Sequence, residues 1–179
     1  MYEDLMYELV DASFEVKEEY LLERAKDGDM DAAYLLAKLY FESDYEPGNA
    51  FEWFLTAAES DHPDATYYLG NFYNHPSGFD VVEPSEENAI SYWSKAVELG
   101  SPLGMDELGW RYMQDGWGVE KDEAKGRELL EKASDLGYHK SLSRLSNCYK
   151  NGIGVEKSVK KALEYAEKAY EALLEEIIC

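Results

Sequence analysis

The sequence predicts an all-α protein built of stacked antiparallel helix pairs, and the main reason is an internal repeat. Four segments that start at Ala32, Ala65, Gly104 and Ser141 align at successive offsets of 33, 39 and 37 residues. Each segment has a small residue, then Leu four positions on, a second small residue beside that Leu, and Tyr three positions further. A second group of small and large apolar residues follows each segment, after a loop that contains Gly or Pro.

We therefore expect each repeat to consist of a helix A, a loop and a helix B. The Leu and Tyr columns of helix A are Leu36, Leu69, Leu108 and Leu145, and Tyr40, Tyr73, Tyr112 and Tyr149. The trios of helix B are Ala50, Trp53 and Ala57; Ala89, Tyr92 and Ala96; Gly126, Leu129 and Ala133; and Ala162, Tyr165 and Ala169. Spacings of three and four place each trio on one helical face. One such pair cannot bury its apolar stripe alone, whereas stacked pairs can.

In chain order, the pattern predicts one repeat domain over residues 1–179. A lone helix B is expected at about 15–27, because it ends in Ala25 and Gly28 as later helices B do. Repeats follow at about 31–60, 64–99, 103–136 and 140–178. The last repeat includes a long capping helix from about 158 to 178, whose apolar residues continue at Tyr170, Leu173, Leu174, Ile177 and Ile178. These residues could close the core or pair with another copy, so we expect a monomer or a weak dimer through this helix.

The charge of the chain excludes two classes of partner. The 179 residues include 38 Asp and Glu against 17 Lys and Arg, a formal net charge of −21. Residues 1–120 carry all of this excess, whereas residues 121–179 hold 11 acids and 11 bases. Nucleic acids and acidic membrane surfaces would be repelled. At 45% hydrophobic residues the chain is too apolar to be disordered.

The expected location is the reducing cytoplasm. No stretch approaches the roughly 18 uncharged residues of a membrane helix, and the acidic first residues lack the basic and apolar regions of a signal peptide. The two cysteines, Cys148 and Cys179, make neither a disulfide framework nor a metal set. Whether these two ever pair stays open.

Acidic residues and histidines do not form a metal site by spacing. A calcium loop that started at Asp27 would need Gly at its sixth position and Glu at its twelfth, and the sequence has Ala32 and Lys38 there. The three histidines, His62, His75 and His139, have no His or Cys at helical spacing. We expect no metal ligands, and an acidic turn before a helix at Asp27–Asp31.

Two Gly-x-Gly pieces, at Gly116 and Gly152, could be mistaken for phosphate loops. They follow helices rather than strands and lack the lysine of a phosphate cradle, so we interpret them as turns that need positive φ. Cys148 lies within a predicted helix A and is expected to be a small buried residue rather than a nucleophile. We therefore predict no cofactor, no catalytic residue and no enzyme activity.

The columns resemble the Sel-1-like repeat family, a relative of tetratricopeptide repeats. The fourth repeat follows the family pattern of Leu-Gly, Tyr, Gly-x-Gly-Val, Ala, Trp and Ala with Leu145–Ser146, Tyr149, Asn151–Val155, Ala162, Tyr165 and Ala169. The third has Gly126 and Leu129 in place of Ala and Trp, and the first two lack the Gly-x-Gly-Val loop. The resemblance implies a right-handed α-solenoid whose concave groove is lined by helices A. It also implies an adaptor role without chemistry.

By analogy with tetratricopeptide domains, groove residues lie two positions before the Leu column and two, five and six after it. The candidates are Tyr34, Lys38, Phe41, Tyr67, Asn71, Asn74, Trp110, Met113, Gln114 and Asn147. Aromatic rings supply contact area, while amides and lysine fix orientation. Tyr34 and Tyr67 could instead pack between repeats. Two loop residues, Phe79 and Trp117, are expected to be either loop anchors or partner contacts.

Two functions remain open from the sequence. The first is a non-catalytic module that binds a protein or peptide through the groove and the acidic first two-thirds of the chain. The alternative is an acidic immunity or inhibitor protein that neutralises a basic toxin or enzyme, such as one that acts on nucleic acid, because its charge would match such a surface.

Overall fold

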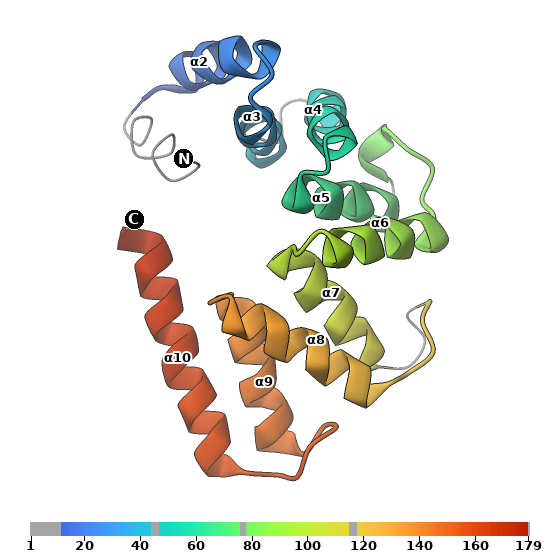
Figure 1. The fold of residues 1–179 in the computed structure, drawn as a ribbon, viewed down its shortest axis with the longest axis vertical. Coiled ribbons are helices and arrows are strands. Elements are labelled where there is room, and N and C mark those ends of the chain that lie inside the picture. Colours follow the sequence, from blue (N-terminus) through green and yellow to red (C-terminus); the bar gives the residue numbers. More distant parts are fainter. Residues whose placement is uncertain (1–11, 44–46, 76–77, 115–117, 179) are drawn as a thin grey trace. The chain divides into compact units, whose positions relative to one another are not determined.

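The computed structural model describes residues 12–43, 47–75, 78–114 and 118–178. These ranges contain nine α-helices, one short 3-10 helix and no strand, which confirms the predicted all-α class (Figure 1). The helices are α2 (Phe14–Lys26), α3 (Met30–Glu42), α4 (Pro47–Glu59), α5 (Pro63–Asn74), η1 (Gly78–Asp80), α6 (Glu86–Glu98), α7 (Pro102–Tyr112), α8 (Glu123–Asp135), α9 (His139–Asn151) and α10 (Val159–Ile178). Helices A are α3, α5, α7 and α9, and the helix that follows each one is its helix B.

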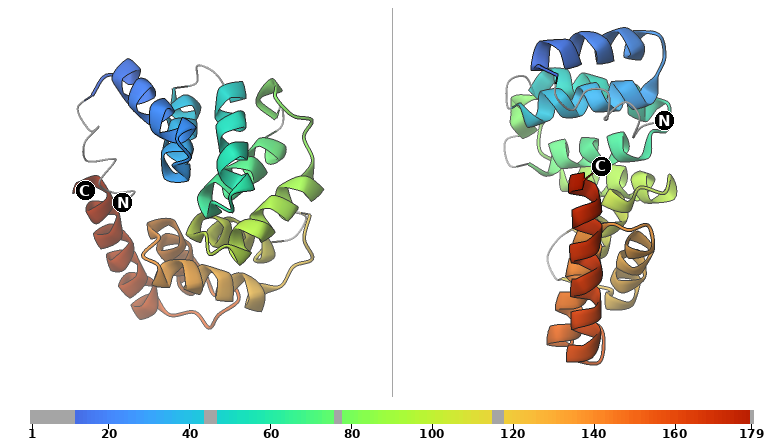
Figure 2. Two further views of the ribbon diagram at one scale, coloured as in Figure 1. Left: turned by 45° about the horizontal axis from the view of Figure 1, so that its top comes forward. Right: turned by 90° about the vertical axis from the view of Figure 1, so that its left-hand side faces the viewer.

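Packing divides the chain into two compact units, residues 1–95 and 96–179, and we describe each by itself. In the first unit, neighbouring helices from α2 to α5 pack in succession. In the second unit, α7 packs on α8, α8 on α9 and α9 on α10, and Figure 2 shows α9 and α10 side by side. Within each unit the helices form the stacked pairs of an α-solenoid.

Most helices A begin at a side chain that caps the free backbone N–H groups. Asp29 accepts a hydrogen bond from the Ala32 N–H at 3.1 Å, and Ser101 accepts one from the Gly104 N–H at 3.1 Å. In α5 the imidazole Nδ1 of His62 has this role toward the Ala65 N–H, at 3.2 Å. The acidic segment before α3 is thus a helix cap, as the sequence indicated, and Asp29 is the capping residue.

The core of the first unit is a cluster of aromatic rings from α3, α4 and α5. Phe54 and Phe72 are fully buried, and the Phe54 ring stacks on Tyr68 with centroids 4.6 Å apart. The Tyr34 ring stacks on His62 at 4.5 Å, where the burial of His62 lowers the pKa of its imidazole. These contacts hold the helix pair α3–α4 against α5.

Helices A and B of one pair approach most closely at the second small column. A Cβ atom on Gly126 would lie 2.6 Å from the Gly109 carbonyl oxygen, so α7 and α8 meet backbone to backbone. Ser146 donates a hydrogen bond from its hydroxyl to the Ala162 carbonyl oxygen at 2.7 Å, which joins α9 to α10. A Cβ atom on Gly70 would lie 2.5 Å from Nε1 of the buried Trp93. At Gly70 and Gly126 the absence of a side chain is therefore a steric requirement of the packing.

The loop of the fourth repeat shows why that motif contains two glycines. Gly152 and Gly154 have φ angles of 76° and 65°, in the left-handed region that favours glycine. The Arg127 guanidinium donates a hydrogen bond to the Gly154 carbonyl oxygen at 2.7 Å and so ties this loop to α8. This confirms the sequence interpretation of the second Gly-x-Gly piece as a turn, whereas Gly116 of the first piece lies outside the described residues.

We expect Gly126→Ala to lower the free energy of unfolding by about 2 kcal/mol, because the new methyl group meets a backbone oxygen that cannot move aside. Gly48→Ala is the matched control, since Gly48 lies in helix α4 and its added Cβ would have no neighbour within 4 Å. That variant should be neutral or gain up to about 1 kcal/mol from helix propensity. Urea unfolding followed by circular dichroism measures both, and equal effects at the two sites would contradict the steric argument.

Candidate partner-binding surface

In the first unit, four of the predicted groove residues reach the surface. The side chains of Lys38, Tyr67 and Asn71 are half-buried, and that of Asn74 is exposed. The Lys38 ammonium lies 3.3 Å from the Glu42 carboxylate, one turn further along α3. The Asn71 side-chain oxygen accepts a hydrogen bond from Nε1 of Trp93 at 3.1 Å. Asn71 thus supports the packing of α6, and Lys38 and Asn74 present polar groups outward.

Of the two other groove candidates of the first unit, Tyr34 is packed inside it and Phe41 is half-buried. Tyr34 is 3% exposed, in line with the alternative role the sequence left open for it. The Phe41 ring has its centroid within 5.5 Å of both Tyr68 and Phe79 and packs edge-on against them. The analogy with tetratricopeptide repeats predicted the helix face on which these side chains lie. It did not predict how deeply they are buried, which depends on aromatic rings of α4 and α5. Tyr34 can therefore only support a binding surface from below, whereas part of the Phe41 side chain stays accessible.

The enlarged loop of the second repeat is fixed by Phe79. Its ring centroid lies 5.0 Å from that of Phe72 and 4.0 Å from that of His75. Phe79 has a φ of 55°, a left-handed conformation that is rare for a large side chain, and its half-buried ring packs on the Phe72 ring of α5. The structure places Phe79 as a loop anchor. Trp117, the other loop candidate, lies outside the described residues.

In the second unit, Trp110 and Asn147 occupy the same column of consecutive helices A. The Trp110 ring is half-buried against the core, and the Arg144 guanidinium lies over it, 5.1 Å from the ring centroid. Asn147 is exposed and accepts a hydrogen bond from the Asn151 amide at 2.6 Å. Gln114, two residues beyond the end of α7, is half-buried. This part of α7 and α9 combines a braced aromatic ring with amide groups.

Met113 is a groove candidate that the structure places in the core, at 2% exposure. Its sulfur would lie 2.8 Å from a Cβ atom on Gly126, and its terminal methyl 3.0 Å from one on Gly154. Met113 thus fills the space that an alanine at position 126 would need. This contact explains why the third repeat departs from the family pattern at that column.

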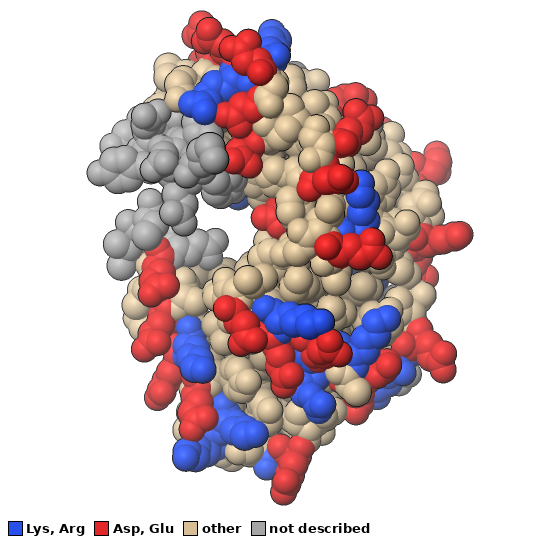
Figure 3. All heavy atoms as spheres, viewed as in Figure 1, with Lys and Arg blue, Asp and Glu red and all other residues tan. Residues whose placement is uncertain are grey.

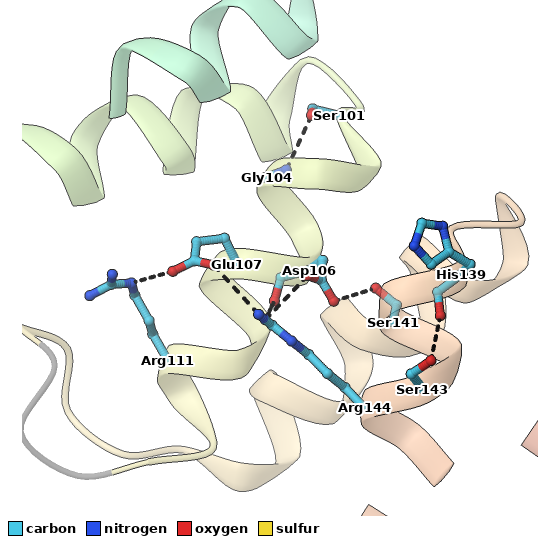
Figure 4. Close-up of polar contacts among 9 residues, drawn as sticks. All are labelled: Ser101, Gly104, Asp106, Glu107, Arg111, His139, Ser141, Ser143 and Arg144. Atoms are coloured by element: carbon cyan, nitrogen blue, oxygen red, sulfur yellow. Dashed lines mark hydrogen bonds and ion pairs between the residues drawn. The ribbon is translucent and has the colours of Figure 1, made fainter. Parts of the chain in front are cut away.

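A polar network joins α7 to α9 beneath this surface (Figure 4). The Ser141 hydroxyl donates to the Asp106 carboxylate at 2.7 Å, and the Arg144 guanidinium lies 3.2 Å from that carboxylate. Arg144 also donates to the Asp106 carbonyl oxygen at 2.7 Å and lies 3.6 Å from the Glu107 carboxylate. The Arg144 guanidinium therefore contacts the Trp110 ring and the acidic residues Asp106 and Glu107 at the same time.

The network includes a carboxylate with little access to water. The Asp106 side chain is 5% exposed, whereas that of Arg144 is 25% exposed. Burial raises the pKa of Asp106, although Arg144 and the hydrogen bond from Ser141 act in the opposite direction. The ion pair thus reduces, without cancelling, the cost of placing a charge there.

Arg144 was not among the residues predicted for the groove, whereas Asp106, two positions before Leu108, lies in a predicted groove column but is buried. A signal was nonetheless present, because Arg144 follows Glu107 by the same 37 residues that separate the third and fourth repeats. Opposite charges in one column of consecutive repeats indicate an ion pair between neighbouring helices A.

Catalytic and metal chemistry find no support within the described ranges. They contain no group of three His, Cys, Asp or Glu side chains that could hold a metal ion. Cys148 is buried, and burial raises the pKa of its thiol, which disfavours the nucleophilic thiolate. Among the described helices, none is long and apolar enough to cross a membrane.

The repeats match a known family over most of the chain. Residues 31–62, 63–101, 102–138 and 139–172 each match the Sel1 repeat. The chain is a Sel1 repeat protein. Members of this family generally mediate protein–protein interactions and typically serve as non-catalytic scaffolds.

Curated relatives of this Sel1 repeat protein are much longer. It is 27% identical over 152 residues to the chitin synthase regulator SKT5 of Saccharomyces cerevisiae. The aligned region covers 82% of this chain and 22% of SKT5. It is 29% identical over 107 residues to an F-box protein of Arabidopsis thaliana, which covers 60% of this chain and 32% of that one. The chain therefore spans a third or less of the length of these relatives.

Solved structures show the same fold. A protective antigen of uropathogenic Escherichia coli is 29% identical with a TM-score of 0.69, over 86% of this chain and 33% of the antigen. A putative Sel1 repeat protein of Klebsiella pneumoniae is 23% identical with a TM-score of 0.69, over 87% of this chain and 74% of that one. The immunity protein Pa5087 of Pseudomonas aeruginosa is 25% identical with a TM-score of 0.65, over 87% and 57%. These likenesses agree with the predicted solenoid.

We expect Arg144→Met to lower the free energy of unfolding by about 2 kcal/mol at neutral pH, because Asp106 then keeps a buried charge without its partner. Lys132→Met is the control, since Lys132 pairs with Glu128 where both side chains are more than half exposed and should cost little. Urea unfolding measures both variants.

The same substitution should cost less when Asp106 is already neutral. In an Asp106→Asn background the loss from Arg144→Met should shrink. The loss from Arg144→Met should also shrink in acid. The pKa of Asp106 is raised in the folded state, so below that pKa the carboxyl is neutral and needs no partner. The stability that comes from the neutral carboxyl is lost as pH rises through the folded pKa, and there the ion pair with Arg144 begins to matter. A loss that is independent of both background and pH would contradict the role assigned to this ion pair.

Proposed function

We propose that this Sel1 repeat protein is a non-catalytic module that holds a protein or peptide on the helix-A face of its repeats. The observation that carries the proposal is the arrangement around Trp110. Its ring is held in place by Arg144 and by the core, and the exposed amide of Asn147 lies in the same column of the next repeat.

This arrangement has the properties of a protein-binding hot spot. A large ring whose orientation is already fixed loses little conformational freedom on binding. Tryptophan and arginine are the residue types most enriched where binding energy is concentrated, and nearby polar groups set the register of the ligand. The proposed contact residues are Trp110, Gln114 and Asn147, with Lys38, Tyr67 and Asn74 as candidates in the first unit. Cys148, the cysteine among the described residues, is unpaired, and we propose that binding takes place in the cytoplasm.

Selection of ligands from a random peptide library displayed on phage tests this proposal. We expect Trp110→Ala to weaken the selected ligands at least about tenfold and Asn147→Ala to weaken them less. Trp110→Phe keeps a ring and should retain part of the affinity, which separates lost contact from lost folding. Asn88→Ala, at an exposed amide on helix B α6, should change nothing. Ligands that bind Trp110→Ala as tightly as the unmodified chain would show that the helix-A face is the wrong surface.

A second candidate function is an inhibitor or immunity protein that covers a basic surface. The first unit, residues 1–95, contains 22 acidic and 5 basic residues, whereas residues 96–179 contain 16 and 12. Three of those five bases, Arg24, Lys38 and Lys95, already pair with carboxylates of the same unit. Figure 3 shows the result as acidic side chains that predominate over α2–α6. The likeness to the Pseudomonas immunity protein supports the same candidate.

If the ligand is basic, its affinity should fall steeply with salt. The screening length shortens from about 30 Å at 0.01 M salt to about 3 Å at 1 M. Removing two exposed acids of α2, with Glu19→Gln and Glu23→Gln, should weaken binding and flatten the salt dependence. Glu120→Gln and Glu156→Gln, equally exposed but in the second unit, should do neither. Calorimetric titration with the phage-selected peptides provides the measurement, and an affinity indifferent to salt would rule out this candidate.

A further inference from the structure

The long helix α10 carries two apolar stripes, and α9 covers one of them. The covered stripe includes Ala162, Tyr165 and Ala169, and the Tyr165 ring stacks on Tyr149 of α9 with centroids 5.5 Å apart. The other, which we call the outer stripe, lies roughly 100° around the helix. It consists of Val159, Leu163, Ala166, Tyr170 and Leu173.

The outer stripe is exposed to an extent unusual for such residues. Val159, Leu163 and Tyr170 are 64%, 60% and 64% exposed, and Leu173 is 38% exposed. Ala166 is also exposed. The spacings along the stripe alternate between four and three residues, which is the heptad pattern of a helix that pairs with another helix. In the inner repeats, helix B has the next helix A packed on it, as α5 packs on α4 and α9 on α8.

We propose that α10 pairs with α10 of a second copy of this chain, antiparallel, through the outer stripe. Self-complementarity is the reason to choose a second copy. A two-fold axis near Lys168 places Leu163 opposite Leu173 and the small Ala166 opposite the large Tyr170 of the other copy. Each large side chain then meets a position that can accommodate it, which a symmetric interface requires.

Charge selects the antiparallel direction. Lys160 and Lys161 lie at the start of α10 and Lys157 just before it, whereas Glu171 and Glu175 lie toward its end. Antiparallel pairing brings the basic start of one helix alongside the acidic end of the other. Parallel pairing would bring like charges together. The Lys160 ammonium lies 3.8 Å from Glu164 with its side chain 88% exposed, so it is free to turn toward a partner helix.

The contact is short, and the dimer is accordingly weak. From Val159 to Leu173 the stripe measures about 21 Å, because a helix rises about 1.5 Å per residue. A single pair of helices of this length lies at the lower end of specific interfaces, for which micromolar dissociation constants are typical. Because α10 is already ordered on α9, pairing does not have to order the helix. This inference does not rest on the proposed partner-binding function, since it uses helix B and not the helix-A face.

Sedimentation velocity of the full chain, from micromolar to millimolar concentration, tests the proposal. We expect a concentration-dependent shift from monomer to dimer mass. Leu163→Glu should raise the dimer dissociation constant at least about tenfold, because it places a charge in the stripe. Leu136→Glu is the matched control, because Leu136 is also 60% exposed but lies at the end of α8. This variant should have the same dimer dissociation constant as the unmodified chain.

Charge reversal tests the direction of pairing. Lys160→Glu and Glu171→Lys should each weaken the dimer, and the two together should restore it. An unmodified chain that stays at monomer mass throughout would overturn the proposal and leave the stripe to a different protein or to a further helix. Equal effects of Leu163→Glu and Leu136→Glu would overturn it as well. Failure of the double charge reversal to restore the dimer would overturn the antiparallel arrangement.

Discussion

The architecture depends on the close approach of the two helices within each pair. At Gly109 and Gly126 the backbones of α7 and α8 are too near for a methyl group, and at Ser146 a hydroxyl bonds directly to the backbone of α10. Because the helices touch at these points, the larger Leu, Tyr and Trp side chains on either side fill the remaining space. The repeat is therefore defined as much by its small residues as by its large ones.

This close approach also shapes the candidate binding surface of the second unit. Gly126 makes room for Met113, which fills the core, while the Trp110 ring of α7 stays half-buried at the surface. Arg144 then connects that ring to the buried Asp106. A charged pair in such a place adds little net stability, but it links α9 to α7 through the buried carboxylate.

The surface of the chain offers three distinct chemistries to partners. The helix-A face combines a braced ring with amides, the first unit is strongly acidic, and α10 presents an apolar stripe. These features are carried by different residues, although the helix-A face and the acidic residues of the first unit share α3 and α5. A scaffold without chemistry of its own can be used in this way, as its family generally is.

The sequence by itself determined the helix pairs and their boundaries. The first described helix runs from Phe14 to Lys26 and the last from Val159 to Ile178, within a residue of expectation, because periodic spacing and capping residues are local signals. Only the tertiary structure decided which residues are accessible. Tyr34, Phe41 and Met113 share columns with surface residues, yet their depth depends on rings and gaps supplied by other helices. Likewise the contact between Asp106 and Arg144 joins distant residues, and no local spacing encodes it.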